Sequence, residues 1–230
     1  MNSMSRRQFL FVLSASLASV PAYHMALGGV EPGNPRQGKS LPITTNILVS
    51  AYEGEVIAHS NYIAFCGKAT KGQYPNLAYL FKAFAASEKI HADNFKRVLE
   101  GMNCAAEEPV FNLVVSDTKA NLNTAATNEM KKIEKTYPGF LNQLRIESHD
   151  EAVVNCMYAW KSHKQHEAKI AEIKRYASSF FESVAEELEG LKLDFHVCEI
   201  CGATVDEPPE TPCGICNYPS SHCHRIERPA

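Results

Sequence analysis

Four cysteines near the end of the chain have the spacing of a metal site. Cys198 and Cys201 form one C-x2-C pair, and Cys213 and Cys216 form a second pair after eleven intervening residues. Two such pairs can place four thiolates at the corners of a tetrahedron, a geometry that suits iron or zinc. Disulfide pairing is the alternative if the protein is exported. The regular spacing favours the four-thiolate site, and the spacing is compatible with either metal.

The other four cysteines do not share this spacing. Cys66, Cys104 and Cys156 stand singly in the sequence, and we expect each to pack as a small apolar side chain. Cys223 lies between two histidines near the end of the chain. We expect it to be a surface thiol and not a fifth ligand of the metal.

A second set of candidate ligands is spread over a long helix-forming region. It contains one Glu-x-x-His motif and one His-x-x-His motif, and side chains three residues apart lie on one face of a helix. Two further helices can each add one glutamate. Helices that turn such residues inward could surround one or two metal ions, the ligand pattern of ferritin-like di-iron bundles. We therefore predict a bundle metal site formed by Glu55, Glu88, His91, Glu129, His163 and His166.

These residues also have ordinary interpretations. Glu53 and Glu55 lie on opposite faces of their helix, so one of them is expected to be solvated. Glu88 could pair with a neighbouring lysine at the surface. The polar run 161–166, which contains both later histidines, could be an exposed face. The nearby Tyr52, His59 and Tyr62 could simply pack or form hydrogen bonds. The presence of an inward-facing Glu or His on each of four predicted helices favours the metal site over these interpretations.

Apolar residues recur at helical spacing and predict the elements that hold this site. Pro75 is placed to begin one helix and Gly101 to end it. A break is expected at 137–139, followed by a short helix over 140–147. Helices of this length predict a mainly α fold, an antiparallel four-helix bundle over residues 43–190. The four main helices are expected at about 43–70, 75–100, 113–136 and 149–188, and the third is expected to open at Ser116–Asp117 or slightly earlier.

The chain opens with a segment typical of protein export. Paired arginines, Arg6 and Arg7, precede a short and weakly apolar run, as in twin-arginine signals. We expect residues 1–22 to be removed, residues 23–42 to be a Gly/Pro-rich linker, and the mature protein to be periplasmic. Such signals carry folded proteins, so the thiolates could take up metal in a reducing compartment first. The alternative is a chance arginine pair on an anchor or a tail.

Composition excludes several classes of protein. The 230 residues are 45% hydrophobic and 21% charged, which excludes collagen-like and disordered chains. The net charge of −3 does not favour nucleic acid as a partner, and no apolar run is long enough for an ordinary membrane span, so we expect no membrane contact after signal removal. Residues 194–230 hold five of the eight cysteines. This segment is too short for a sizeable core, so we expect a separate small module.

The combination of helical Glu-x-x-His ligands and a four-cysteine tail resembles the rubrerythrin family over about residues 43–228. Four segments carry this likeness: 51–55, 87–91, 117–122 before the third-helix glutamate, and 137–140 after it. The tail resembles a rubredoxin-type centre, in which four thiolates hold one iron. The resemblance implies a ferritin-like fold with non-haem iron in the bundle. It implies ligand roles for Glu55, Glu88, His91, Glu129 and His166.

Two positions depart from the family pattern. The family's third helix carries Glu-x-x-Glu, whereas Lys132 stands in the second position here; the family's fourth helix carries Glu-x-x-His, whereas His163 stands in the first. Three carboxylates remain where the family has five. Buried positive charge needs compensation, so we expect a site biased toward ferrous iron or toward one metal instead of two. Lys132 could instead extend into solvent and leave an open coordination position.

The resemblance implies a peroxide reductase. The bundle would reduce hydrogen peroxide, the tail would relay electrons, and the protein would be a homodimer. Export would require an unknown periplasmic electron donor, because soluble nicotinamide donors are cytoplasmic. Two alternatives are iron binding or ferroxidase-type metal handling, which the missing carboxylates favour, and an electron carrier whose bundle site is inactive.

Overall fold

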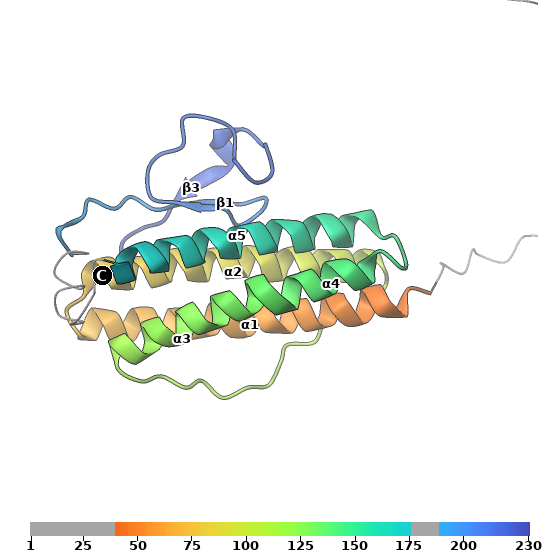
Figure 1. The fold of residues 1–230 in the computed structure, drawn as a ribbon, viewed down its shortest axis with the longest axis horizontal. Helices are drawn as coiled ribbons and strands as arrows, with labels where there is room; N and C mark the ends of the chain where they lie inside the picture. The colour runs from red at the N-terminus through yellow and green to blue at the C-terminus, as the bar shows by residue number, and fades with distance from the viewer. Residues whose placement is uncertain (1–39, 176–188) are drawn as a thin grey trace, which may run out of the picture. The chain divides into compact units, whose positions relative to one another are not determined.

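The structure, a computed structural model, describes residues 40–175 and 189–230. The predicted signal at 1–22, most of the linker, and residues 176–188 of the predicted fourth helix lie outside these ranges. The long helices lie side by side as a bundle (Figure 1). None of the described helices combines the length and apolar character needed to cross a bilayer. The helices are α1 (Pro42–Lys71), α2 (Pro75–Gly101), α3 (Thr118–Lys131), α4 (Tyr137–Leu144) and α5 (Asp150–Arg175).

The starts of the first two helices each have a proline in the first turn and a carboxylate, distant in sequence, that accepts a backbone hydrogen bond. Pro42 and Pro75 stand in the first turn of α1 and α2, where a proline costs no helical hydrogen bond. Glu147 accepts a hydrogen bond from the N–H of Thr44 at 2.8 Å, and Glu189 accepts one from the N–H of Asn76 at 2.9 Å. These contacts satisfy N–H groups that have no acceptor within the helix, and they connect the helix starts to later segments of the chain.

The third helical region differs from the prediction. It begins at Thr118, next to the expected Ser116–Asp117 opening, and the side chain of Asp117 caps α3 by accepting from the N–H of Ala120 at 2.8 Å. The predicted break at 137–139 is wrong, and the short helix expected at 140–147 starts earlier. A π-helix, η1 (Lys132–Thr136), leads directly into α4. Pro138 lies in the first turn of α4, where its missing N–H costs least.

Two apolar clusters lie along the bundle, and the predicted metal site falls between them. One cluster contains Phe65, Phe81 and Phe84, and the other contains Phe95 and Leu144. On α1, α2 and α5, and on the segment from α3 to α4, the buried acids and imidazoles lie in the sequence between residues of one cluster and residues of the other. A polar layer therefore crosses the middle of an otherwise apolar interior, where unpaired charge is costly.

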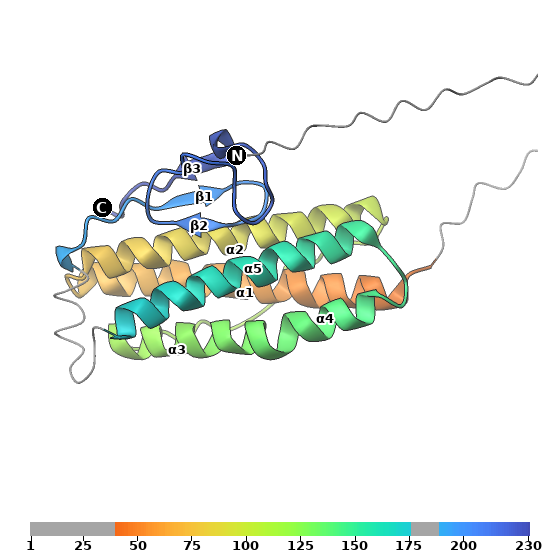
Figure 2. The ribbon, with the colours of Figure 1, turned by 45° about the horizontal axis from the view of Figure 1, so that its top comes forward.

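The C-terminal segment forms a small module against the bundle. Strands β1 (His196–Cys198), β2 (Thr204–Val205) and β3 (Cys223–Arg225) form an antiparallel sheet in the order β2-β1-β3. A 3-10 turn, η2 (Ser220–His222), precedes β3. The module lies along α2 and α5 (Figure 2). Tyr79 on α2 accepts a hydrogen bond from the N–H of Phe195 at 3.0 Å and donates one to the carbonyl of Ile226 at 2.6 Å.

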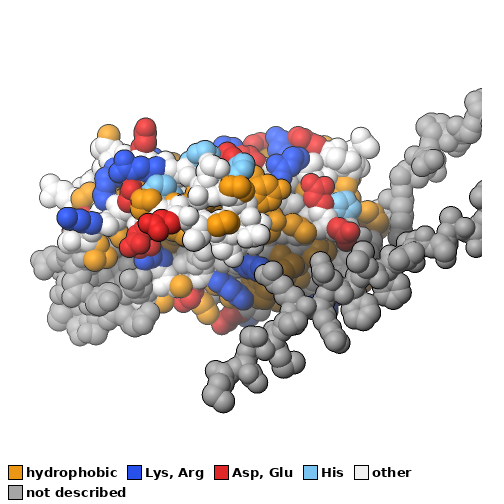
Figure 3. Space-filling model, turned by 90° about the horizontal axis from the view of Figure 1, so that it is seen from above, with side chains coloured by type: hydrophobic (Ala, Val, Ile, Leu, Met, Phe, Trp, Pro, Cys, Tyr) orange, Lys and Arg blue, Asp and Glu red, His pale blue; other side chains and the backbone are white. Residues whose placement is uncertain are grey.

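The surface around this module carries both signs of charge. On the face shown in Figure 3, basic and acidic side chains are interspersed with histidines and apolar side chains. This mixture agrees with the small net charge of −3 for the whole chain. The described structure is thus a mainly α, ferritin-like bundle with a small β module attached.

Candidate metal centres

The six predicted bundle ligands lie together in the interior. Every one of these residues is at most 1% exposed, whereas the neighbouring Glu53 is exposed. Their ligand atoms form two overlapping groups, and within each group the atoms lie within 4.8 Å of one another. The first group is Glu55, Glu88, His91 and His163, and the second is Glu88, Glu129, His163 and His166.

Glu88 belongs to both groups. Its Oε2 lies 2.9 Å from Nδ1 of His91, and its Oε1 lies 3.6 Å from Nδ1 of both His163 and His166. Surface pairing of Glu88 is therefore wrong, since Lys89 instead pairs with Asp93 at 2.8 Å. Neither Oε1 of Glu88 nor Nδ1 of His166 has a hydrogen-bond partner among the described residues. Buried atoms of this kind that face one another fit a bound metal cation.

The ring of His166 is oriented by the C-terminal module. The hydroxyl of Thr204 donates to the carbonyl of Gly202 at 3.2 Å, so its oxygen accepts from Nε2–H of His166, also at 3.2 Å. With the proton on Nε2, the lone pair of Nδ1 faces the oxygens of Glu88 and Glu129, the latter at 3.7 Å. An outer partner that sets the tautomer in this way is typical of metal-binding histidines.

His163 lies between three carboxylates, so the exposed-face interpretation of the run 161–166 is wrong for both of its histidines. Its Nδ1 lies 2.9 Å from Oε2 of Glu129, and its Nε2 lies 3.1 Å from Oε1 of Glu55. Burial and the ammonium of Lys132 oppose protonation of His163. The surrounding carboxylates outweigh both and raise its pKa to about 10. A metal cation that binds Nδ1 must therefore displace a proton from this ring.

Lys132 turns inward and does not extend into solvent. Its ammonium forms an ion pair with Oε2 of Glu55 and lies 3.6 Å from Oε1 of Glu88, and the side chain is 15% exposed. Burial opposes this charge, but the carboxylates of Glu55, Glu88 and Glu129 outweigh it and raise the pKa of Lys132. Lys132 is also the first residue of η1, and π-helical turns are frequent at functional sites.

Two tyrosines that the sequence did not assign to the site hold its carboxylates. Tyr62 donates to Oε1 of Glu129 at 2.5 Å, and Tyr137 donates to Oε1 of Glu55. Burial and the adjacent carboxylates raise both phenol pKa values well above the usual one. Tyr62 follows Glu55 by seven residues, two helical turns, and this spacing could have indicated a shared face. Tyr137 falls in the expected helix break at 137–139, so the sequence did not indicate its contact with Glu55.

A pocket of about 310 Å³ lies between α1 and the line from α3 to η1. Its lining includes Ala58, Tyr62, Glu129 and Lys132, so one predicted ligand, its tyrosine partner and the inward-turned lysine contribute to its wall. One water occupies about 30 Å³ of liquid. The pocket can therefore hold a small polar molecule next to the bundle site.

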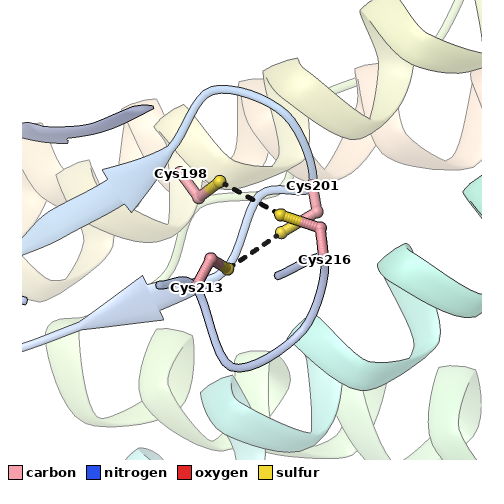
Figure 4. Close-up of side chains that lie close together, drawn as sticks. All are labelled: Cys198, Cys201, Cys213 and Cys216. Carbon is pink, nitrogen blue, oxygen red and sulfur yellow. Dashed lines mark hydrogen bonds between the residues drawn. The ribbon is translucent and has the colours of Figure 1, made fainter. Parts of the chain in front are cut away.

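The four cysteines of the tail converge as their spacing predicts. Sγ of Cys198 lies 3.7 Å from Sγ of Cys216, and Sγ of Cys201 lies 3.5 Å from Sγ of Cys213 (Figure 4). Four sulfurs at about 2.3 Å from one metal would lie about 3.8 Å apart. A hydrogen bond with the Cys201 thiol outweighs burial and lowers the pKa of Cys198 to about 5. All eight cysteines are free, so the disulfide interpretation is wrong.

The C-terminal module contacts α2 and α5 next to His91, one of the bundle histidines. The carbonyl of Gly202 accepts from Oγ of Ser87 at 2.6 Å and from Oγ of Ser162 at 2.8 Å. The carbonyl oxygen of Cys201 lies 3.2 Å from Nε2 of His91. Gly202 has φ +75°, and a Cβ there would lie 2.3 Å from the same nitrogen. The approach of a thiolate loop to a bundle histidine of the same chain therefore requires glycine.

Comparison with known proteins agrees with these two sites. The family model described as Rubrerythrin matches residues 46–174. Rubrerythrin-2 of Clostridium acetobutylicum is 33% identical over 178 residues, which cover 76% of this chain and 91% of that protein. Nigerythrin of Nitratidesulfovibrio vulgaris is 29% identical over 180 residues, which cover 76% of this chain and 83% of that protein.

Solved structures agree on the fold. A mixed-valence nigerythrin structure has a TM-score of 0.69 at 25% identity, with 83% of this chain and 90% of that chain covered. Mycobacterium tuberculosis bacterioferritin has a TM-score of 0.60 at 11% identity, with 65% and 95% covered, which shows the ferritin-like fold alone. Rubrerythrins bind a di-iron centre in the bundle and iron in a four-cysteine site, and both candidate sites are present here. With its inward-facing bundle ligands and its four converging cysteines, the chain belongs to the rubrerythrin family.

Proposed function

We propose that this di-iron-family oxidoreductase reduces hydrogen peroxide at the bundle centre, with electrons supplied through the four-thiolate tail. The position of His91 carries this proposal. Its Nδ1 lies 2.9 Å from Glu88, which belongs to both ligand groups, and its Nε2 lies 3.2 Å from the carbonyl of Cys201, a residue of the tail site. A single imidazole therefore connects the two centres within one chain. The homodimer implied by the resemblance is not needed for this relay.

The chain's own groups suit a small, polar oxidant. When bound, iron supplies the one-electron redox chemistry that side chains cannot perform. The pocket beside α1 admits the oxidant, and the ammonium of Lys132, which has further N–H groups beside its ion pair with Glu55, lines it as a hydrogen-bond donor. Reduction of peroxide to water consumes protons as well as electrons. Donor groups that share a wall with the bundle site can orient the peroxide oxygens and pass protons toward them.

The source of electrons follows from location. We propose that residues 1–22 direct export and that the mature protein acts in the periplasm, where a small redox protein would reduce the tail. The tail site lies at the outer side of the bundle, along α2 and α5 (Figure 2). Cys216 is partly exposed there, so a donor could approach the thiolates directly.

Peroxide consumption by the full-length, iron-loaded protein with an artificial reductant tests this proposal. We expect peroxide-dependent turnover, and we expect the visible absorption of the reduced tail to recover when peroxide is added. Cys213→Ser should abolish both signals, whereas Cys223→Ser should preserve them because Cys223 lies outside the four-thiolate group. Iron-loaded protein whose tail stays reduced in excess peroxide would overturn the assignment.

Metal handling is a second candidate function, and the inward position of Lys132 favours it. A lysine where the family has a carboxylate leaves three carboxylates around the bundle site. Fewer carboxylates stabilise ferric iron less well. If ferrous iron is bound and oxidised by dioxygen while added peroxide is not consumed, this candidate replaces the first.

A further inference from the structure

We propose that the bundle of this protein holds a single metal ion, bound by Glu88, Glu129, His163 and His166, and that the ammonium of Lys132 takes the place of a second cation. In this arrangement Glu55 is an outer partner and not a ligand. The inference concerns metal content, so it holds whichever substrate the centre serves. It departs from the di-iron content of the family because of two residues particular to this chain, Lys132 and His163.

The first argument is charge. Glu55, Glu88 and Glu129 bring three negative charges into the interior, and each of these residues is at most 1% exposed. The ammonium of Lys132 and one divalent ion neutralise these three charges. A second divalent ion would leave the same space with two uncompensated positive charges, because the remaining ligands are imidazoles. Buried charge without a partner is strongly disfavoured.

The second argument is the position of Lys132. Its ammonium pairs with Oε2 of Glu55 and lies 3.6 Å from Oε1 of Glu88. An ion bound to Glu55 would therefore have to bind directly beside this ammonium, whereas the second group meets the ammonium only at Oε1 of Glu88, 3.6 Å away. Two cations side by side in a buried site repel each other strongly. The lysine therefore disfavours metal in the group that contains Glu55.

The third argument is that Glu55 already has its partners. Oε2 accepts from Lys132, and Oε1 accepts from the hydroxyl of Tyr137 and lies 3.1 Å from Nε2 of His163. A proton on Nε2 of His163 donated to Glu55 leaves the lone pair of Nδ1 for a metal. A carboxylate that receives the outer N–H of a metal-binding histidine is a common arrangement. Glu55 thus orients His163 toward the second group.

The second group is complete without Glu55. Nδ1 of His163 lies 2.9 Å from Oε2 of Glu129, and the unpartnered Nδ1 of His166 faces the unpartnered Oε1 of Glu88. Tyr62 holds the other oxygen of Glu129 at 2.5 Å. Two carboxylates and two imidazoles give four protein ligands, a set that suits ferrous iron or zinc.

Metal counting on the full-length protein tests the inference. After anaerobic loading with excess ferrous ion and removal of loose metal, elemental analysis should find one ion in the tail and one in the bundle. Lys132→Glu restores a carboxylate and should add one further ion. Lys131→Glu is the matched control, because it makes the same change of charge on an exposed neighbour and should add none. A second bundle ion in the unmodified protein would overturn the inference.

Two histidine variants keep the inference testable if Lys132→Glu does not fold. His166→Ala should lose the bundle ion, whereas His91→Ala should retain it, because His91 belongs only to the group that contains Glu55. Equal loss of one ion in both variants would indicate two bound ions and overturn the inference. This outcome can be distinguished from failure of the proposed function. A bundle that binds one ion and consumes no peroxide would support this inference and contradict the proposed peroxide reduction.

Discussion

Nε2 of His91 lies 3.2 Å from the carbonyl oxygen of Cys201, so a histidine of the bundle touches the backbone of a cysteine of the tail. The same ring lies 2.9 Å from Glu88 through Nδ1. Only one imidazole thus separates the carboxylate shared by both bundle ligand groups from the thiolate loop. Changes to this contact should affect communication between the centres more than either centre alone.

Gly202→Ala should disrupt the contact sterically. Its Cβ would lie 2.3 Å from Nε2 of His91 and 3.0 Å from Oγ of Ser87, and φ at this position is +75°. Overpacking of this kind costs about 1–3 kcal/mol, so the thermal midpoint of unfolding should fall. Reoxidation of the reduced tail by peroxide, followed by its visible absorption, should slow at least tenfold.

Gly214→Ala is the matched control for this change. Gly214 also belongs to a C-x2-C loop, but apart from its chain neighbours no atom of the described residues lies within 4 Å of the position of its Cβ. We expect Gly214→Ala to unfold and reoxidise as the unmodified protein does. Equal behaviour of the two alanine variants would show that the tail does not pack against His91 in solution.

Removing the serine hydroxyls should loosen the module without altering its metal site. Ser87 and Ser162 both donate to the carbonyl of Gly202. The double change to alanine removes two of the three hydroxyls that donate to this oxygen and leaves that of Thr204, at a cost of about 1–3 kcal/mol. Amide hydrogen exchange over 196–205 should become faster while the visible spectrum of the tail stays the same.

Ser60→Ala serves as the control for the serine pair. Its hydroxyl donates to the carbonyl of Val56 within α1 and does not contact the module. Exchange over 196–205 should be unchanged in this variant. Unchanged exchange in the double serine variant as well would contradict the packing seen here.

Tyr62→Phe should weaken metal binding in the bundle. The change removes the hydroxyl that holds Oε1 of Glu129 at 2.5 Å and leaves the ring in place. Loss of an outer partner of a ligand typically lowers metal affinity about 10–100-fold. Competition with a chelator for ferrous ion measures this change. Tyr52→Phe, whose hydroxyl instead contacts Glu108 at 3.4 Å, should bind metal as before.

Removal of the tail metal should release the module but spare the bundle. The module buries Cys198, Cys201 and Cys213 in its small core and has few apolar residues to replace the metal. Structural metals of this kind supply much of the folding free energy of small domains. Mild chelation should expose residues 194–230 to protease while the helical circular dichroism of the bundle persists. Simultaneous loss of both signals would show that the bundle depends on the tail metal.

Local spacing explains why both metal sites could be found in the sequence. Residues three apart share a helix face, so Glu88 and His91 had to point the same way. Each C-x2-C loop holds its two thiolates close together because only two residues separate them, so the tail site could also be predicted from the sequence. The helical bundle followed from apolar periodicity, its ferritin-like type followed from the ligand pattern and the family resemblance, and the structure confirms the bundle.

Only the tertiary structure decided the features that distant residues control. A flexible lysine turns toward whichever charges lie nearby, so the inward position of Lys132 depends on Glu55, which lies on another helix. The π-helix that carries Lys132 continues through Pro138 into α4, and Trp160 on α5 donates to the carbonyl of Ile133 in this turn at 2.9 Å. The contact of Gly202 with Ser87 and Ser162 joins segments far apart in sequence. Sequence spacing specifies side-chain direction within one element, but packing and charge between elements decide which side chains meet.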